Sequence, residues 1–170
     1  MNNLLVQKIT EVFRPQVPLW ACEITGKHVI VAGVQKGRKR IRNKVAVELP
    51  PNAVLGSLSE VNIRDRDVVR NLVKETLKHA GFEGAEIAVV VPDDAARIAF
   101  LTVDKLSRDP AEQQTFIRWK LKKTVPFDVD TAQVAYQVLG THMGNGNGRS
   151  VGLDMLVTLS PRSIVQEYED

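Results

Sequence analysis

The sequence has one cysteine, three histidines and no long apolar run, and each of these shortages excludes a class of protein. A single thiol, Cys22, cannot form an internal disulfide, which fits a reducing compartment. Because Cys22 lies in an apolar, strand-like run, we interpret it as a buried and inert thiol. His28, His79 and His142 are scattered without the spacing of metal ligands, so no metal site is predicted. No apolar run approaches the roughly 20 residues that cross a bilayer, so no membrane span is predicted either.

The N-terminal segment MNNLLVQKITEVF also lacks the basic start and the unbroken apolar core of a secretory signal. Its apolar residues predict a short helical face that packs on its own domain, with a membrane-surface helix as the alternative. These residues are Leu4, Leu5, Ile9, Val12 and Phe13. The sequence therefore predicts a cytoplasmic protein.

Motifs of the common enzyme classes are missing. The sequence contains no G-x-x-x-x-G-K-[ST], G-x-S-x-G, H-E-x-x-H or C-x-x-C pattern. The carboxylate pair Asp93 and Asp94 lies in a predicted hairpin turn, which explains it. Gly144, Gly146 and Gly148 lead into a strand and not onto a helix N-terminus, so they predict a flexible hairpin and not a phosphate loop. We therefore expect a protein that is not an enzyme.

Length and composition predict a globular α/β (α+β) protein. The chain has 170 residues, of which 44% are hydrophobic and 25% charged, and this length allows roughly 70% of the unfolded surface to be buried. Strands are predicted at 19–24, 28–34 and 44–49. A helix follows, capped by Asp65 or Asp67 and ended by Gly81 as a left-handed C-terminal cap. Its apolar face comprises Val68, Val69, Leu72, Val73, Thr76, Leu77 and Ala80.

The remainder of the chain predicts the order β-β-α-β-β. Segments 85–91 and 97–103 are expected to pair as antiparallel strands across a tight hairpin. Asp109 as cap and Pro110 as first residue begin a helix that runs to about Thr124. Strands at 132–139 and 151–159 follow. Ser160 and Pro161 are then expected to cap and begin a last helix.

A basic segment, QKGRKRIRNK, connects the second and third predicted strands. It predicts a solvated hairpin or, as the alternative, contact of Arg38, Lys39 and Arg40 with anionic lipid headgroups or an acidic partner. Nucleic acid is the weakest interpretation, because no aromatic residues are interleaved for stacking and the net charge is only +3.

The most specific segment of the chain is 116–140, FIRWKLKKTVPFDVDTAQVAYQVLG. In it Trp119 is followed by Pro126 and Phe127, and then by Tyr136 in the strand-like run YQVLG. This order resembles the PilM family, cytoplasmic actin-like proteins of bacterial type IV pilus assembly. WACEITGKHVIVAGV, LPPNAVLGSL and AEIAVVVPDDAARIAFLTV resemble the family in the same order. The likeness runs from about residue 19 to the C-terminus.

The resemblance implies a partial actin-like (ribonuclease H-like) fold. Residues 1–83 would form the actin-type subdomain with a three-stranded sheet and helices, and residues 84–159 an inserted β-β-α-β-β subdomain. Residues 160–170 would begin a helix that is cut short. The family order also implies a degenerate phosphate turn in which Glu23 stands at the acid position, Thr25 at the glycine position, and Gly26 one residue later. A β-branched residue there hinders the close approach of backbone to phosphate.

The resemblance further implies a partner and a place in the cell. The chain would be a scaffold at the inner face of the bacterial inner membrane, peripheral to it through its partner, in pilus biogenesis and twitching motility or in related secretion machinery. It would receive the cytoplasmic tail of a PilN-like membrane protein in the cleft between the two subdomains, with other pilus platform proteins as further partners. Trp119, Pro126, Phe127 and Tyr136 are the candidate contacts, with core packing as an equal alternative for Trp119.

Two other functions stay open at this point. One is an actin-like ATPase, in which Mg-ATP would bind only when a second half, absent from this chain, completes the site. The other is an FtsA-like cell-division protein with a terminal membrane-binding helix. No cofactor is expected in this chain alone.

Overall fold

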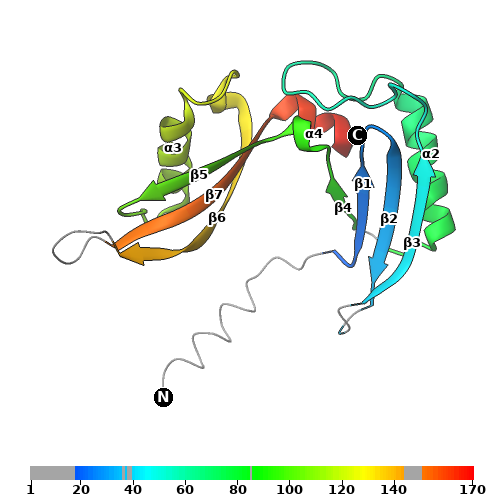
Figure 1. The fold of residues 1–170 in the computed structure, drawn as a ribbon, viewed down its shortest axis with the longest axis horizontal. Helices are drawn as coiled ribbons and strands as arrows, with labels where there is room; N and C mark the ends of the chain where they lie inside the picture. The colour runs from blue at the N-terminus through cyan, green and yellow to red at the C-terminus, as the bar shows by residue number, and fades with distance from the viewer. Residues whose placement is uncertain (1–17, 36, 38–39, 85, 144–150) are drawn as a thin grey trace.

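The structure, a computed structural model, describes residues 18–35, 37, 40–84, 86–143 and 151–170. Two sheets lie side by side, and each has its own helix and its own hydrophobic core (Figure 1). This arrangement confirms the predicted mixed α/β (α+β) class. None of the helices in these ranges is long and apolar enough to cross a membrane. The predicted apolar helix at residues 4–13 lies outside the described ranges.

The first sheet has the strand order β3-β2-β1-β4. It consists of β1 (Trp20–Ile24), β2 (His28–Val34), β3 (Ile41–Glu48) and β4 (Ala88–Val90). β1, β2 and β3 pair as an antiparallel meander, as their short connections predict. Alternate residues of β1 and β2 point into the core, and the opposite pairs Cys22–Val31 and Ile24–Val29 are buried.

Helix α2 (Arg66–Ala80) covers this sheet and has both of the predicted caps. The Asp65 side chain accepts the backbone N–H of Val68 at 3.2 Å. Gly81 has a φ of 71°, and its N–H closes the last turn in the left-handed conformation that glycine adopts without strain. The Asn43 side-chain amide donates to the Ala80 carbonyl at 2.8 Å, which ties the end of α2 to β3.

The predicted antiparallel hairpin between segments 85–91 and 97–103 is wrong, because β4 belongs to the first sheet. It pairs in parallel with β1, where Ala88 lies opposite Ala21 and Val90 opposite Glu23. Parallel pairing needs a long crossover, which the loop and α2 between β3 and β4 supply. The short 3-10 helix η1 (Asp93–Ala95) then carries the chain to the second sheet instead of reversing it. The first sheet therefore has four strands and the second three, and the expected division of the chain at residues 83 and 159 stays a prediction.

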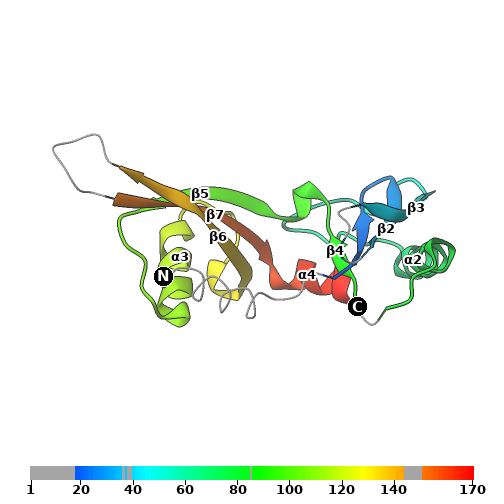
Figure 2. The same cartoon turned by 90° about the horizontal axis from the view of Figure 1, so that it is seen from below.

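The second sheet is antiparallel with the order β5-β7-β6. Its elements are β5 (Arg97–Val103), α3 (Pro110–Leu121), the 3-10 helix η2 (Val129–Thr131), β6 (Ala132–Met143) and β7 (Val151–Pro161). α3 packs on one face of this sheet, and no other described helix lies on the opposite face (Figure 2). The fully buried Ile117 and Leu121 of α3 pack in one core with Met155 and Val157 of β7.

The ends of α3 agree only in part with the sequence prediction. The Asp109 side chain accepts the N–H of Ala111 at 2.9 Å, and Pro110 is the first helical residue, as predicted. The helix ends at Leu121 and not near Thr124. The Thr124 N–H still bonds to the Leu121 carbonyl at 2.9 Å, so a turn continues the chain there.

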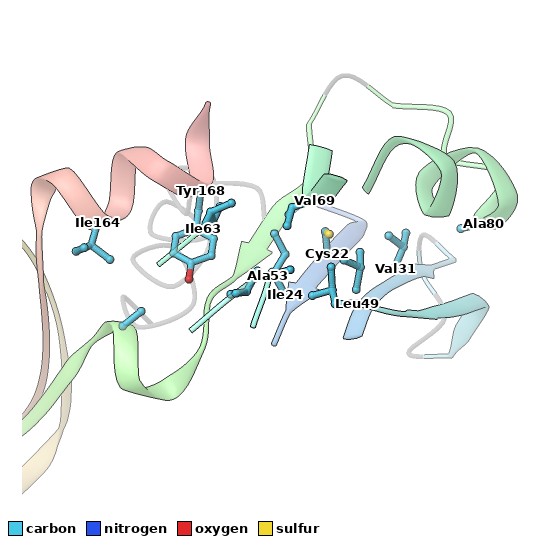
Figure 3. Packing of buried hydrophobic residues seen from close by; sticks show 13 residues of the cluster. Cys22, Ile24, Val31, Leu49, Ala53, Ile63, Val69, Ala80, Ile164 and Tyr168 are labelled. Carbon is cyan, nitrogen blue, oxygen red and sulfur yellow. The ribbon is translucent and has the colours of Figure 1, made fainter. Parts of the chain in front are cut away.

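Helix α4 (Arg162–Glu169) returns the chain to the first sheet, where Ile164 and Tyr168 are buried in its core (Figure 3). The predicted cap is wrong, because Pro161 occupies the N-cap position and Ser160 belongs to β7. The buried Ser160 hydroxyl instead donates to the Ala95 carbonyl at 2.7 Å. This bond joins the two connections between the sheets, since Ala95 ends η1 on the outward connection.

The Glu167 carboxylate fixes α4 against the loop that precedes α2. One of its oxygens accepts the N–H groups of Asn62 and Ile63 at 2.8 and 3.0 Å. The buried Asn62 side chain organises the same loop by accepting from the Ser57 N–H and donating to the carbonyls of Ser57 and Glu60.

We expect Glu167→Ala to lower the free energy of unfolding by about 2 kcal/mol, because two charge-assisted hydrogen bonds are lost and two N–H groups are left without an acceptor. Glu167→Gln keeps an acceptor oxygen and should cost less than half as much. Denaturant unfolding of the two variants measures the difference. Equal losses would contradict a role for the carboxylate as an acceptor.

Candidate functional site

The predicted phosphate turn lies between β1 and β2, and three of its backbone N–H groups are occupied within the turn. The Thr25 hydroxyl accepts the N–H groups of Lys27 and His28 at 3.2 and 2.9 Å. The Thr25 N–H in turn donates to the His28 carbonyl at 2.9 Å. A side chain at Gly26 would meet the Val54 carbonyl oxygen at 3.4 Å. Glu23 is exposed in β1 opposite Ile30.

The four candidate partner contacts differ in exposure. Phe127 and Tyr136 are partly buried against the second core, and the Tyr136 hydroxyl donates to the Gln113 side chain. Pro126 is exposed in the segment after α3. Trp119 is 68% exposed on α3, so it is not a core residue. A partner role for these residues stays a prediction.

Two side chains of α3 lie close to the exposed Trp119 ring. The Phe116 ring lies 6.1 Å from the Trp119 ring, centroid to centroid, and the Lys120 ammonium lies 5.5 Å from the Trp119 centroid. Of the basic residues predicted to contact lipid, Arg38 and Lys39 lie outside the described residues, and Arg40 is exposed. Their membrane contact stays a prediction too.

Sequence reasoning missed a groove between α2 and α4, which lies over β1 and β4. Its volume is about 280 Å³, and its floor is apolar. Val69 and Val73 form the α2 side, Cys22 and Val89 belong to the strands, and Tyr168 closes the α4 side. Figure 3 shows Val69 near Cys22 of β1, and Tyr168 beside Ile63 beneath α4. The signal was present in the four-residue spacing of Val69, Val73 and Leu77, but that pattern indicates burial whether or not a neighbour covers it.

The rim of the groove carries opposite charges on its two sides. α2 contributes Arg66, Arg70 and Lys74, and the end of α4 contributes Glu167, Glu169 and Asp170. Arg66 and Asp170 approach to 3.7 Å across one end, as a half-exposed ion pair that adds little stability. An extended peptide in the groove would have cations along one side and carboxylates along the other.

Burial raises the pKa of two titratable groups that line the groove, Cys22 and Tyr168. Burial raises the pKa of the Cys22 thiol to about 11, which agrees with the predicted inert thiol. Burial, and secondarily the charge of Glu167, raises the pKa of the Tyr168 hydroxyl above its usual range. That hydroxyl is buried and has no hydrogen-bond partner among the described residues.

β4 adds a second binding element at the edge of this groove. It pairs with β1 on one side, and no other described strand pairs with it on the other. Val89 lines the groove and is 42% exposed. The free edge offers backbone N–H and C=O groups to an extended segment, while the groove offers space for its apolar side chains. The arrangement can hold a peptide. Among the described residues, no three His, Cys, Asp or Glu side chains come together as a metal site requires.

Comparison with known proteins gives a likeness in structure but not in sequence. No protein-family model and no curated protein matches the chain. A solved structure described as a PilM-PilN type IV pilus biogenesis complex matches with a TM-score of 0.72 and 14% identity, over 91% of this chain and 44% of the matched chain. The cytoplasmic domain of EpsL, an inner membrane component of the type II secretion system of Vibrio cholerae, matches with a TM-score of 0.48 and 8% identity. That match covers 89% of this chain and 50% of the EpsL chain.

The low sequence identities and the partial coverage limit what the likeness means. At 14% identity the first match establishes the fold and not the activity, and the second is too distant to support an argument. The chain spans less than half the length of the PilM-PilN complex chain that it matches. Within its own length, however, nine-tenths of it superimposes. The chain therefore has a PilM-like, actin-type fold.

Proposed function

We propose that this chain is a non-enzymatic scaffold of a type IV pilus or related secretion assembly. It binds the cytoplasmic tail of a PilN-like membrane protein as an extended segment along the free edge of β4, with apolar side chains in the groove between α2 and α4. The tail holds the chain at the inner face of the bacterial inner membrane, and the chain is peripheral to the membrane through this partner. Other pilus platform proteins and a role in twitching motility belong to the same proposal.

One observation carries the proposal: an apolar groove runs beside an unpaired strand edge. An extended tail would add main-chain hydrogen bonds to β4 and place alternate side chains over Val73 and Val89. This site lies on the first sheet, beside α2, and so differs from the cleft between subdomains that the family resemblance implies.

The structural likeness supports the choice of partner, since the matched structure is a complex of PilM with PilN. The β1–β2 turn supports a function without nucleotide, since Thr25 occupies the N–H groups of Lys27 and His28. We therefore include the absence of Mg-ATP binding by this chain in the proposal.

Calorimetric titration tests the proposal. The chain is titrated with a synthetic peptide of the cytoplasmic tail of a PilN-like protein from the same organism, with a scrambled peptide of the same composition, and with Mg-ATP. We expect saturable binding of the tail peptide, with a Kd on the order of micromolar, and no binding of the other two ligands. Equal binding of the scrambled peptide would overturn the proposed tail recognition. ATP binding without peptide binding would make a nucleotide-dependent protein the better account.

A further inference from the structure

The strand β5 is an unprotected edge of the second sheet. It lies at the end of the order β5-β7-β6, and all seven of its residues pair with β7 in unbroken register. Its sequence after Arg97 is IAFLTV, without a charge or a proline. Phe100 is 76% exposed and Ile98 60% exposed, on the face that no described helix covers.

The edges at β3 and β6 differ from β5 in ways that hinder strand addition. Natural edge strands avoid association by being short, bulged or charged. The β6 edge has a register shift between Val138 and Gly140. β3 carries Arg42 and Lys44 among its exposed residues. β5 is long, regular and apolar, which is the combination that pairs with another strand.

We propose that β5 pairs with β5 of a second copy of this chain. The strand is antiparallel to its copy about a two-fold axis at Phe100, which is its central residue. Phe100 lies opposite Phe100, Ile98 opposite Thr102, and Ala99 opposite Leu101. The second sheet of one copy and the second sheet of the other become one six-stranded sheet. Both α3 helices lie on one face of it, and the apolar patches of Phe100 and Ile98 merge on the other face.

The sequence of β5 favours its own copy as the occupant. Its apolar pattern is nearly symmetric about Phe100, so one register satisfies both strands at once. A single strand pair is smaller than a standard stable interface of roughly 1,200 to 2,000 Å², so we expect a weak, concentration-dependent dimer. The groove between α2 and α4 lies on the other sheet, so the dimer is independent of tail binding.

Cysteine cross-linking in the full chain tests the register. Opposite residues in antiparallel strands have Cα atoms about 4.5 to 5.5 Å apart, within disulfide range. We expect Phe100→Cys to give a disulfide-linked dimer under mild oxidation. Thr102→Cys is the matched control on the same strand and face, because the two-fold axis separates its copies by about 14 Å along the strand. Cys22 is buried, and its pKa is raised to about 11, so it does not react in the folded chain. Equal cross-linking of both variants, or of neither, would overturn the proposal.

Sedimentation velocity tests the association without cysteines. The parent chain should shift toward dimer as its concentration is raised, and Phe100→Lys should stay monomeric. Gln137→Lys adds the same charge on the same face at the opposite edge, in β6, and should behave like the parent. A parent chain that stays monomeric at the highest concentration reached overturns the proposal. So does a dimer that Phe100→Lys leaves intact.

Discussion

Replacing Ile117 with alanine should lower the free energy of unfolding by about 3 to 4 kcal/mol, which is a large part of the stability of a domain this size. Ile117 is fully buried in α3 and packs in the second core with Met155 and Val157. The loss combines the transfer of the missing methyl groups with the cavity that the surrounding side chains fail to fill. Denaturant unfolding followed by circular dichroism measures it.

Trp119→Ala is the matched control for this prediction. Trp119 lies two residues further along the same helix and is a larger side chain, but it is 68% exposed. Its removal should therefore change the free energy of unfolding by less than about 1 kcal/mol. A cost for Trp119→Ala that matches the cost for Ile117→Ala would show that the Trp119 ring packs in the core, contrary to its position in the structure.

Replacing Val73 with aspartate is expected to weaken binding of the tail peptide by roughly 2 kcal/mol or more, about thirtyfold in Kd. Val73 lines the groove from α2. In the empty groove water reaches the new carboxylate, but a bound peptide would bury it against apolar side chains. Calorimetric titration of the variant with the tail peptide gives the change directly.

Asn71→Asp controls for charge, because it adds the same carboxylate to the same helix on an exposed position outside the groove. It should bind the peptide like the parent chain. Val73→Thr keeps the shape of valine, so it tests the groove even if Val73→Asp fails to fold. Its loss of binding should lie between the losses of the two aspartate variants. If Asn71→Asp weakens binding as strongly as Val73→Asp, net charge and not the groove governs recognition.

Local signals in the sequence predicted much of the first sheet and both larger helices. Asp65, Gly81, Asp109 and Pro110 act on backbone groups within one helical turn of themselves, so their effect can be seen in a short segment. β2 was predicted with the bounds it has, because turn residues enclose a short apolar run.

The pairing of β4 and the groove depend on contacts between distant segments, which the sequence pattern does not contain. The apolar run at β4 suits a hairpin and a parallel pair equally well, and the crossover through α2 decides between them. The groove exists because α4 returns to the first sheet, held by Glu167 against Asn62 and by Ser160 against Ala95. Ser160 had the sequence pattern of a helix cap, but its hydroxyl donates to the distant Ala95 carbonyl instead.

Amide hydrogen exchange of the chain with and without saturating tail peptide tests the central claim most directly, because it locates the bound segment. Our account predicts slower exchange at the β4 amides of Ala88 to Val90 and along the groove side of α2, with no change in β5, β6 and β7. Protection confined to the second sheet or to α3 around Trp119, despite saturable binding, would contradict it and would place the tail on the other sheet.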